Sequence, residues 1–150
     1  MEIIKITKTN RYYKEIINIY YKWWLNTKKM SLNDINNLFK DTLDNNELPH
    51  IYALIINDTL IGTYQINKKD DIDEKEYEPY LADVYIKEEY RGRGLSKTLI
   101  QDAITKAKEL GYKTLYLHSS LKNYYEKFGF TFLEEVPTKY GNKRIYKQDI

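Results

Sequence analysis

A predicted strand that runs through a double-glycine turn straight into a long amphipathic helix constrains the fold more than any other feature of the sequence. The strand covers 80–87 (YLADVYIK), and the turn contains Gly92 and Gly94. From Leu95 to Leu110, apolar residues recur at the spacing of one helix face, and Gly111 follows where a helix often ends. A strand joined so closely to a helix predicts an α/β domain in which the helix packs on a sheet.

The rest of the chain divides into short segments with strand or helix patterns. Asn57-Asp58-Thr59 between two apolar runs predicts a hairpin, and Ser31 with Asp34 three residues later predicts a capping box that starts a helix. Helices are predicted over 11–25, from Ser31 onward, and over 120–128; strands are predicted over 2–7, 51–56, 60–66, 113–118, 130–136 and 144–147. This order predicts a mixed α/β sheet with helices on its faces, in a single domain over 1–150.

Composition excludes several classes of function. The chain has no cysteine, which excludes disulfides, thiolate metal sites and a cysteine nucleophile. With only His50 and His118 present, a multi-histidine zinc site is not expected either, so we expect no metal. The net charge of +2 argues against nucleic acid as a partner. No apolar run approaches the roughly 18 residues of a membrane span, and the start of the chain lacks a signal-peptide core, so we expect a cytoplasmic protein with no membrane partner.

The glycine turn has the properties of an anion site. The first amides of a helix have no partner within the helix, and the helix dipole adds partial positive charge there. Glycines let the backbone approach a ligand closely, and Arg91, Arg93 and Lys97 add full charges. A dinucleotide fingerprint fails because position 97 is not glycine, and a Walker A loop fails because positions 91 and 96 are not glycine. The turn therefore predicts a cradle for a pyrophosphate of another kind.

The pattern [Q/R]-x-x-G-x-[G/A] is met by Arg91 and Gly94, with Ser96 as a small-residue departure. This resembles motif A of the GNAT superfamily of N-acetyltransferases, which cradles the pyrophosphate of acetyl-CoA. The run YLADVYIKEEYRGRGLSKTLI, then KELGYKTLYL, then YYEKFGF at 124–130 follow in the family's order and spacing, so the likeness covers most of 50–136. It implies the GNAT fold, with a mixed, mostly antiparallel sheet of about six to seven strands flanked by about four helices, and acetyl-CoA as cosubstrate.

The resemblance also implies roles for individual residues. In the family, the strand before the glycine turn pairs with the pantetheine arm, and one backbone N–H of this strand, here of Ile86 or a neighbour, stabilises the oxyanion. Tyr125 aligns with the tyrosine that protonates the leaving thiolate, with Tyr124 beside it. The implied cofactor contacts are Val84, Tyr85, Ile86, Arg91, Gly92, Arg93, Gly94, Leu95, Ser96, Lys97 and Asn123. The family often has asparagine seven residues before the tyrosine, where this chain has His118, which leaves open whether His118 or Asn123 contacts CoA.

The general base is expected on the strand before the glycine turn. Strand alternation places Asp83 and Tyr85 on the face opposite Val84 and Ile86, and Asp83 is the best single carboxylate for this role. Glu74, Glu76 and Glu78 are alternatives that would act through water. The acidic residues over 70–78 form either a rim that attracts a cationic amine or a solvated loop. Trp23 and Trp24 either line an acceptor pocket or belong to the core.

The sequence thus predicts an N-acetyltransferase that moves the acetyl group of acetyl-CoA directly to a primary amine of a small-molecule or peptide acceptor. The absence of cysteine fits direct transfer, because no cysteinyl acetyl-enzyme can form. A CoA-binding sensor or interaction module without transfer activity is the alternative. An edge strand near the C-terminus would allow a homodimer.

Overall fold

The computed structural model describes residues 1–25, 27–69 and 76–150. Seven strands form one sheet in the order β1-β2-β3-β4-β5-β7-β6. The strands are β1 (Glu2–Lys5), β2 (His50–Ile56), β3 (Thr59–Asn67), β4 (Tyr80–Ile86), β5 (Thr114–Ser119), β6 (Thr131–Thr138) and β7 (Gly141–Asp149). The helices are α1 (Tyr13–Trp24), α2 (Leu32–Leu38) and α3 (Leu95–Glu109), with single 3₁₀ turns η1 (Glu88–Tyr90) and η2 (Tyr125–Phe128). Neighbouring strands are antiparallel except β4 and β5, which are parallel, so the predicted mixed, mostly antiparallel sheet is confirmed.

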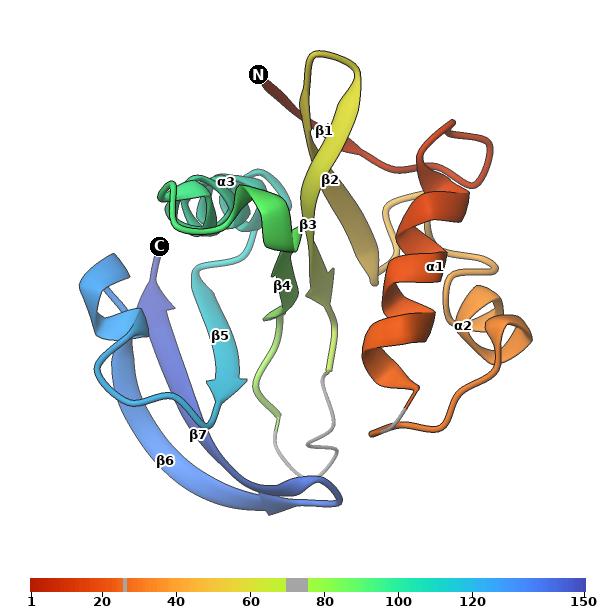
Figure 1. Cartoon of the computed structure of the whole chain (residues 1–150). Helices are drawn as coiled ribbons and strands as arrows, with labels where there is room; N and C mark the ends of the chain where they lie inside the picture. Colours follow the sequence, from red (N-terminus) through yellow and green to blue (C-terminus); the bar gives the residue numbers. More distant parts are fainter. Residues whose placement is uncertain (26, 70–75) are drawn as a thin grey trace.

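Helices cover both faces of the sheet, as Figure 1 shows, with α1 and α2 on one side and α3 on the other. The alternation of β2 supplies both cores, because Leu54 packs with the buried face of α3 whereas Ala53 and Ile55 pack with α1 and α2. The stripe predicted on α3 is buried at Leu99, Ala103 and Ala107, together with Ile100. The capping box predicted at the start of α2 is present, with both reciprocal hydrogen bonds formed between Ser31 and Asp34. None of the helices described here is long and apolar enough to cross a membrane.

The described residues contain three α-helices, where the resemblance implied about four. The helix predicted over 120–128 is wrong in its first half, since only the turn η2 forms at its end. Asn123 adopts a left-handed backbone with φ +58, and the amide of Leu121 donates to Ser119 Oγ (3.0 Å) instead of a helical carbonyl. These local hydrogen bonds and the left-handed residue prevent a continuous helix before Tyr124.

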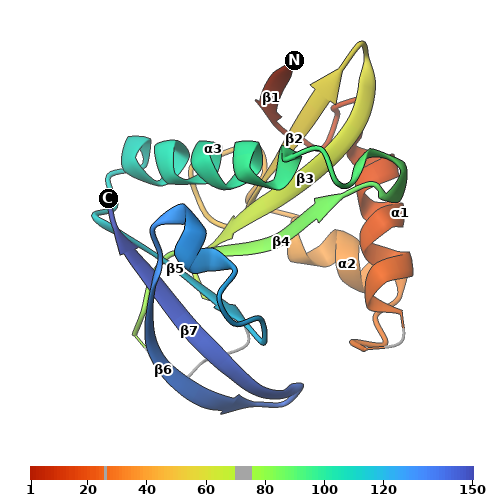
Figure 2. The ribbon, with the colours of Figure 1, turned by 60° about the vertical axis from the view of Figure 1, so that its left-hand side comes forward.

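The parallel pair β4 and β5 opens along its length. The two strands meet where Tyr80 pairs with Tyr116, whose amide also donates to Pro79 O (3.0 Å). From this end they diverge, as Figure 2 shows, while β4 stays paired with β3 as far as Ile86 opposite Gly62. An added Cβ at Gly62 would lie 2.6 Å from the carbonyl oxygen of Tyr85, so glycine lets β4 follow β3 closely on this side. The opening therefore exposes the edge of β4 that faces β5, whereas the opposite edge of β4 stays paired with β3.

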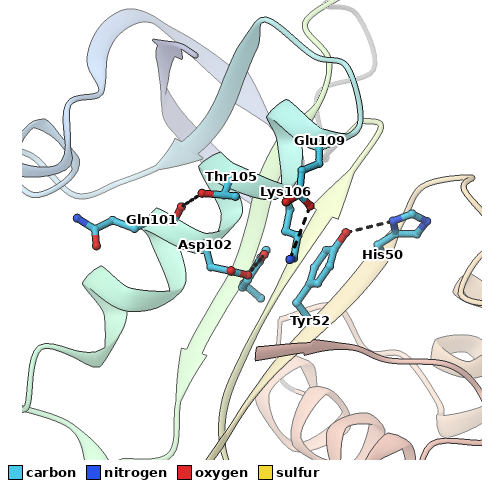
Figure 3. A network of polar contacts seen from close by, with 8 residues as sticks. His50, Tyr52, Gln101, Asp102, Thr105, Lys106 and Glu109 are labelled. Atoms are coloured by element: carbon cyan, nitrogen blue, oxygen red, sulfur yellow. Dashed lines mark hydrogen bonds and ion pairs between the residues drawn. The ribbon is translucent and has the colours of Figure 1, made fainter. Parts of the chain in front are cut away.

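A polar network joins α3 to the sheet (Figure 3). The hydroxyl of Tyr64 on β3 donates to Asp102 Oδ2 on α3 (2.8 Å), and its ring stacks on Tyr52 of β2 with centroids 5.0 Å apart. Tyr52 Oη lies 3.4 Å from His50 Nδ1, and burial raises the pKa of Tyr52 to about 12. Burial, followed by the negative charge of Asp102, also raises the pKa of Tyr64. These contacts fix the long helix, and hence the glycine turn at its start, against β2 and β3.

Candidate active site

Two pockets lie along β4 beside its opening to β5. The first, which we call the glycine-turn pocket, has a volume of about 380 Å³ and is lined by Ile86, Tyr90, Arg91, Gly92, Gly94, Leu95, Ser96, Lys97, Tyr124 and Phe128. The second, which we call the cleft pocket, has a volume of about 350 Å³ and is lined by Trp23, Trp24, Thr27, Lys28, Leu81, Ala82, Asp83, Val84, Leu117, His118, Tyr125, Tyr140 and Lys143. Strand β4 contributes to both, because Ile86 lines the first and Val84 lines the second.

The glycine turn presents bare backbone at the start of α3. Gly92 and Gly94 have left-handed φ values of +79 and +74, which favour glycine. Gly94 is the N-cap of α3 and no side chain caps the helix, so the first amides of α3 are open to a ligand. A Cβ added at either glycine would meet no atom within 4 Å, and both glycines line the pocket. This arrangement fits the phosphate oxygens of an extended ligand.

The arginines beside this turn take different positions. The guanidinium Nε of Arg91 donates to Ile86 O (2.8 Å), and its plane lies over the ring of Tyr85, 5.4 Å from the centroid. Its side chain therefore ties the turn back to β4. The guanidinium of Arg93 lies over Tyr90, 5.5 Å from the centroid, whereas Lys97 lines the pocket. Charge at the pocket wall thus comes from Lys97 and from Arg91, which is already bonded to the strand.

Most of the sequence-predicted cofactor residues meet in this region, but not all of them. Val84 lines the cleft pocket, and Tyr85 packs against Trp23 with ring centroids 5.2 Å apart. Within the described part of the chain, Arg93 and Asn123 line neither pocket. The members that line the glycine-turn pocket are Ile86, Arg91, Gly92, Gly94, Leu95, Ser96 and Lys97.

Adjacent tyrosines at the start of η2 face different pockets. Tyr124 lines the glycine-turn pocket and Tyr125 lines the cleft pocket, and their rings meet edge to face with centroids 4.9 Å apart. Tyr125 also lies 6.2 Å from the ring of Phe130 and 6.2 Å from that of Tyr146. Burial among these rings raises the pKa of Tyr125 to about 12. Tyr125 is therefore a neutral phenol at pH 7, able to donate a proton into the cleft pocket.

Asp83 lies at a bulge in β4. Its φ is +52, and the pairing of β3 with β4 shifts register at this level. Asp83 lines the cleft pocket, and burial, followed by the negative charge of Asp83, raises the pKa of Tyr20 on α1. The side chains of Val84 and Ile86 pack with the core beneath α3, whereas Tyr85 meets α1. A half-buried carboxylate on the floor of the cleft pocket can accept a proton from a bound ammonium.

The other candidate bases have different surroundings. Glu78 accepts a hydrogen bond from the hydroxyl of Tyr112 (3.2 Å), next to the C-terminal end of α3. Glu76 is exposed and lines neither pocket in the part of the chain that the structure describes. Glu74, together with Asp70, Asp71 and Asp73, lies outside the described residues.

Several residues of the cleft pocket were not expected from the sequence. Lys28 follows α1, whereas Tyr140 and Lys143 come from the β6–β7 hairpin, more than a hundred residues away along the chain. No local pattern marks these positions. The two tryptophans share the pocket wall although they differ in burial, since Trp24 is 5% exposed and Trp23 is 41% exposed.

The fold is shared with solved acetyltransferase structures of low sequence identity. No curated protein sequence matches the chain. A GNAT family acetyltransferase from Elizabethkingia anophelis, solved with acetyl-CoA bound, has a TM-score of 0.67 at 16% identity over 99% of this chain and 97% of its own. The ribosomal-protein-alanine N-acetyltransferase from Brucella melitensis has a TM-score of 0.76 at 14% identity over 100% of each chain. The aminoglycoside 6'-N-acetyltransferase from Enterococcus faecium has a TM-score of 0.71 at 15% identity over 99% and 97%.

At these identities the solved structures establish a shared fold. The sequence profile of the acetyltransferase (GNAT) family also establishes the family, because it matches residues 13–130 and so covers well over half of the chain. The match spans β4, the glycine turn, α3 and the two tyrosines Tyr124 and Tyr125. The chain is therefore an acetyltransferase and belongs to the acetyltransferase (GNAT) family.

Proposed function

We propose that this enzyme transfers the acetyl group of acetyl-CoA directly to a primary amine bound in the cleft pocket. The observation that carries the proposal is the course of β4, which lines the glycine-turn pocket with Ile86 and the cleft pocket with Val84. One extended ligand can follow this strand from the open amides at the start of α3 to Tyr125. No other strand contributes to both pockets among the described residues.

The chain supplies complementary groups along this path. The amides of 92–96 and the ammonium of Lys97 would hold the pyrophosphate. The edge of β4 that faces β5 has one register pair in the described residues, Tyr80 with Tyr116. The backbone of Val84 and the amide of Ile86 would therefore be available to the pantetheine arm, whereas the carbonyl of Ile86 already accepts a hydrogen bond from Arg91 Nε. The thioester would then lie between β4 and Tyr125.

The chemistry requires the ammonium of the acceptor to lose two protons and the thiolate to gain one. Asp83 would take the proton of the acceptor's ammonium, and the free amine would then attack the thioester carbonyl. A backbone N–H of β4 would stabilise the oxyanion. As the C–N bond forms, the nitrogen would release its second proton to solvent. As the C–S bond breaks, Tyr125 would donate its proton to the departing sulfur and then regain one from solvent, and its raised pKa suits this role because the phenol stays protonated.

The test measures acetyl-CoA binding and CoA release separately. Titration calorimetry reports binding, and a thiol reagent reports released CoA without background, because the chain contains no cysteine. We expect binding together with CoA release that depends on an added primary amine. If acetyl-CoA binds but no primary amine causes CoA to be released, the protein is a silent CoA-binding module, and the proposal is contradicted.

A further inference from the structure

We propose that a groove between α1 and α2 is a docking site for an acidic peptide segment of a partner protein. The groove, which we call the α1–α2 pocket, has a volume of about 600 Å³ and is lined by Lys8, Thr9, Asn10, Arg11, Tyr13, Lys14, Ile17, Asn18, Leu32 and Asn36. None of these residues lines the glycine-turn pocket or the cleft pocket. Docking on this surface is therefore independent of acetyl transfer.

The pocket has an apolar floor that two helices hold in place. Tyr13 and Ile17 of α1 are only 9% and 3% exposed. The hydroxyl of Tyr13 donates to Asn36 Oδ1 on α2 (2.8 Å), and Asn36 Nδ2 donates to Leu32 O (2.9 Å), so the floor joins helices that cover the same face of the sheet (Figure 1). Leu32, the first residue of α2, is 42% exposed. An apolar side chain of a ligand can therefore be covered between the helices.

The charged residues in the lining are all cations, namely Lys8, Arg11 and Lys14. Lys8 is half-buried and Lys14 is exposed, and neither forms an ion pair within the part of the chain that the structure describes. Arg11 donates through Nη2 to Asp58 O (3.3 Å), and its guanidinium lies 4.7 Å from the ring centroid of Tyr12. These contacts orient Arg11 and leave its charge without a carboxylate partner among the described residues.

The carboxylates nearest in the chain or in contact with this region have other partners. Glu15, on the first turn of α1, pairs with Lys87, and the capping box engages Asp34. Asp44 Oδ1 accepts from the backbone amide of Lys8 (3.3 Å) and not from its ammonium. No side chain caps α1, and the dipole of this helix adds positive potential at the same end. Like charges gathered here cost free energy, and an acidic ligand would offset that cost.

The spread of the three cations favours an extended peptide over a single small anion. Lys8 belongs to the loop after β1 and Lys14 to the first turn of α1, whereas Arg11 bonds to the turn between β2 and β3. Charges on three separate segments match successive carboxylates better than one ion. An apolar residue between those carboxylates would pack against Leu32. The pocket therefore suits an acidic segment that contains one large apolar side chain.

The experiment measures peptide binding by titration calorimetry. The probe is the pentapeptide Asp-Glu-Leu-Glu-Asp, acetylated at its N-terminus and amidated at its C-terminus, so it offers no amine for acetyl transfer. The control peptide Asn-Gln-Leu-Gln-Asn removes the charges, and Asp-Glu-Ala-Glu-Asp removes the leucine side chain. Lys14→Gln is compared with Lys22→Gln, which removes the same charge from an exposed lysine of α1 that does not line the pocket. The unfolding midpoint of each variant reports whether the fold is retained.

We expect the wild type to bind the acidic leucine peptide more tightly than either control peptide, with an affinity that falls as salt concentration rises. Lys14→Gln should weaken binding about threefold, the scale of one partly exposed ion pair, whereas Lys22→Gln should bind as the wild type does. The proposal is overturned if a control peptide binds equally well, if both variants bind alike, or if millimolar peptide gives no heat of binding. Binding to anionic phospholipid vesicles without binding of the peptide would also overturn it and would assign the surface to a membrane.

Discussion

Tyr80 of β4 and Tyr116 of β5 form the parallel register pair at which these two strands meet, and their rings lie 5.9 Å apart. Further along the strands, Val84 and His118 both line the cleft pocket. The separation of two parallel strands beyond one pair creates space for a ligand within the sheet itself. The site is thus a consequence of sheet topology, and its walls come from α1 and the β6–β7 hairpin.

Gly94→Glu should abolish acetyl-CoA binding. Gly94 lines the glycine-turn pocket, so the new carboxylate would repel a pyrophosphate bound there, and the φ of +74 at position 94 would add backbone strain. Gly111→Glu is the matched control, because Gly111 has φ +93 and open space around its Cβ but follows the other end of α3. Calorimetry should show binding lost in the first variant and retained in the second. Equal affinity in both would refute the role of the turn.

The value of kcat should show no alkaline decline between pH 8 and pH 10. The protonated form of Tyr125 is the active one, and burial raises its pKa to about 12, so the acid stays available below that pH and is lost above it. The check is a pH profile of kcat at saturating substrates over this range. A fall that reaches about twofold at pH 10, where an unperturbed phenol is half ionised, would contradict this placement of Tyr125.

Gly62→Ala should destabilise the sheet and weaken acetyl-CoA binding together. The added Cβ would lie 2.6 Å from the carbonyl oxygen of Tyr85 and 2.7 Å from Cδ1 of Ile86, so β4 would have to move away from β3. Overpacking of this kind typically costs about 1–3 kcal/mol in the free energy of unfolding. Denaturant unfolding and calorimetry measure the two effects. If the unfolding midpoint and the affinity for acetyl-CoA are both unchanged, β4 can shift at this position without cost, and the prediction is contradicted.

Tyr64→Phe should reduce the loss of stability at alkaline pH. Because the pKa of Tyr64 is raised above its unfolded value near 10, its contribution is complete below pH 10 and declines as the pH rises toward the folded-state pKa. Above pH 10, the free energy of unfolding should therefore fall less steeply in the variant, by about 1.4 kcal/mol per pH unit. At pH 7 the variant loses the bond to Asp102, which costs about 1–3 kcal/mol. Parallel stability curves above pH 10 would contradict this prediction.

The parts of the fold predicted from the sequence are those that local interactions determine. Three features depend on residues only a few positions apart and can therefore be recognised in the sequence: the α3 stripe, the capping box of Ser31 and Asp34, and the glycine turn. The left-handed backbone of Asn123, which shortens the last predicted helix, could not be predicted, because asparagine can adopt either a right-handed or a left-handed backbone.

The walls of the candidate site could not be predicted because they are tertiary. Lys28 and Lys143 lie at opposite ends of the sequence and meet only when α1 and the β6–β7 hairpin flank β4. The acidic stretch over 70–78, interpreted as either a rim or a solvated loop, falls largely on residues 70–75, outside those described. The division of Tyr124 and Tyr125 between two pockets likewise follows from the turn η2, since both residues are tyrosines with identical chemistry.

The most direct test of the central claim is kcat for Tyr125→Phe beside Tyr124→Phe, with the dissociation constant of acetyl-CoA measured for each. Both changes remove one hydroxyl and keep the ring. If Tyr125 protonates the leaving thiolate, its variant should lose about 100-fold in kcat while binding acetyl-CoA within about twofold of the wild type, and Tyr124→Phe should keep kcat within about threefold. Equal kcat in Tyr125→Phe and the wild type would contradict the account.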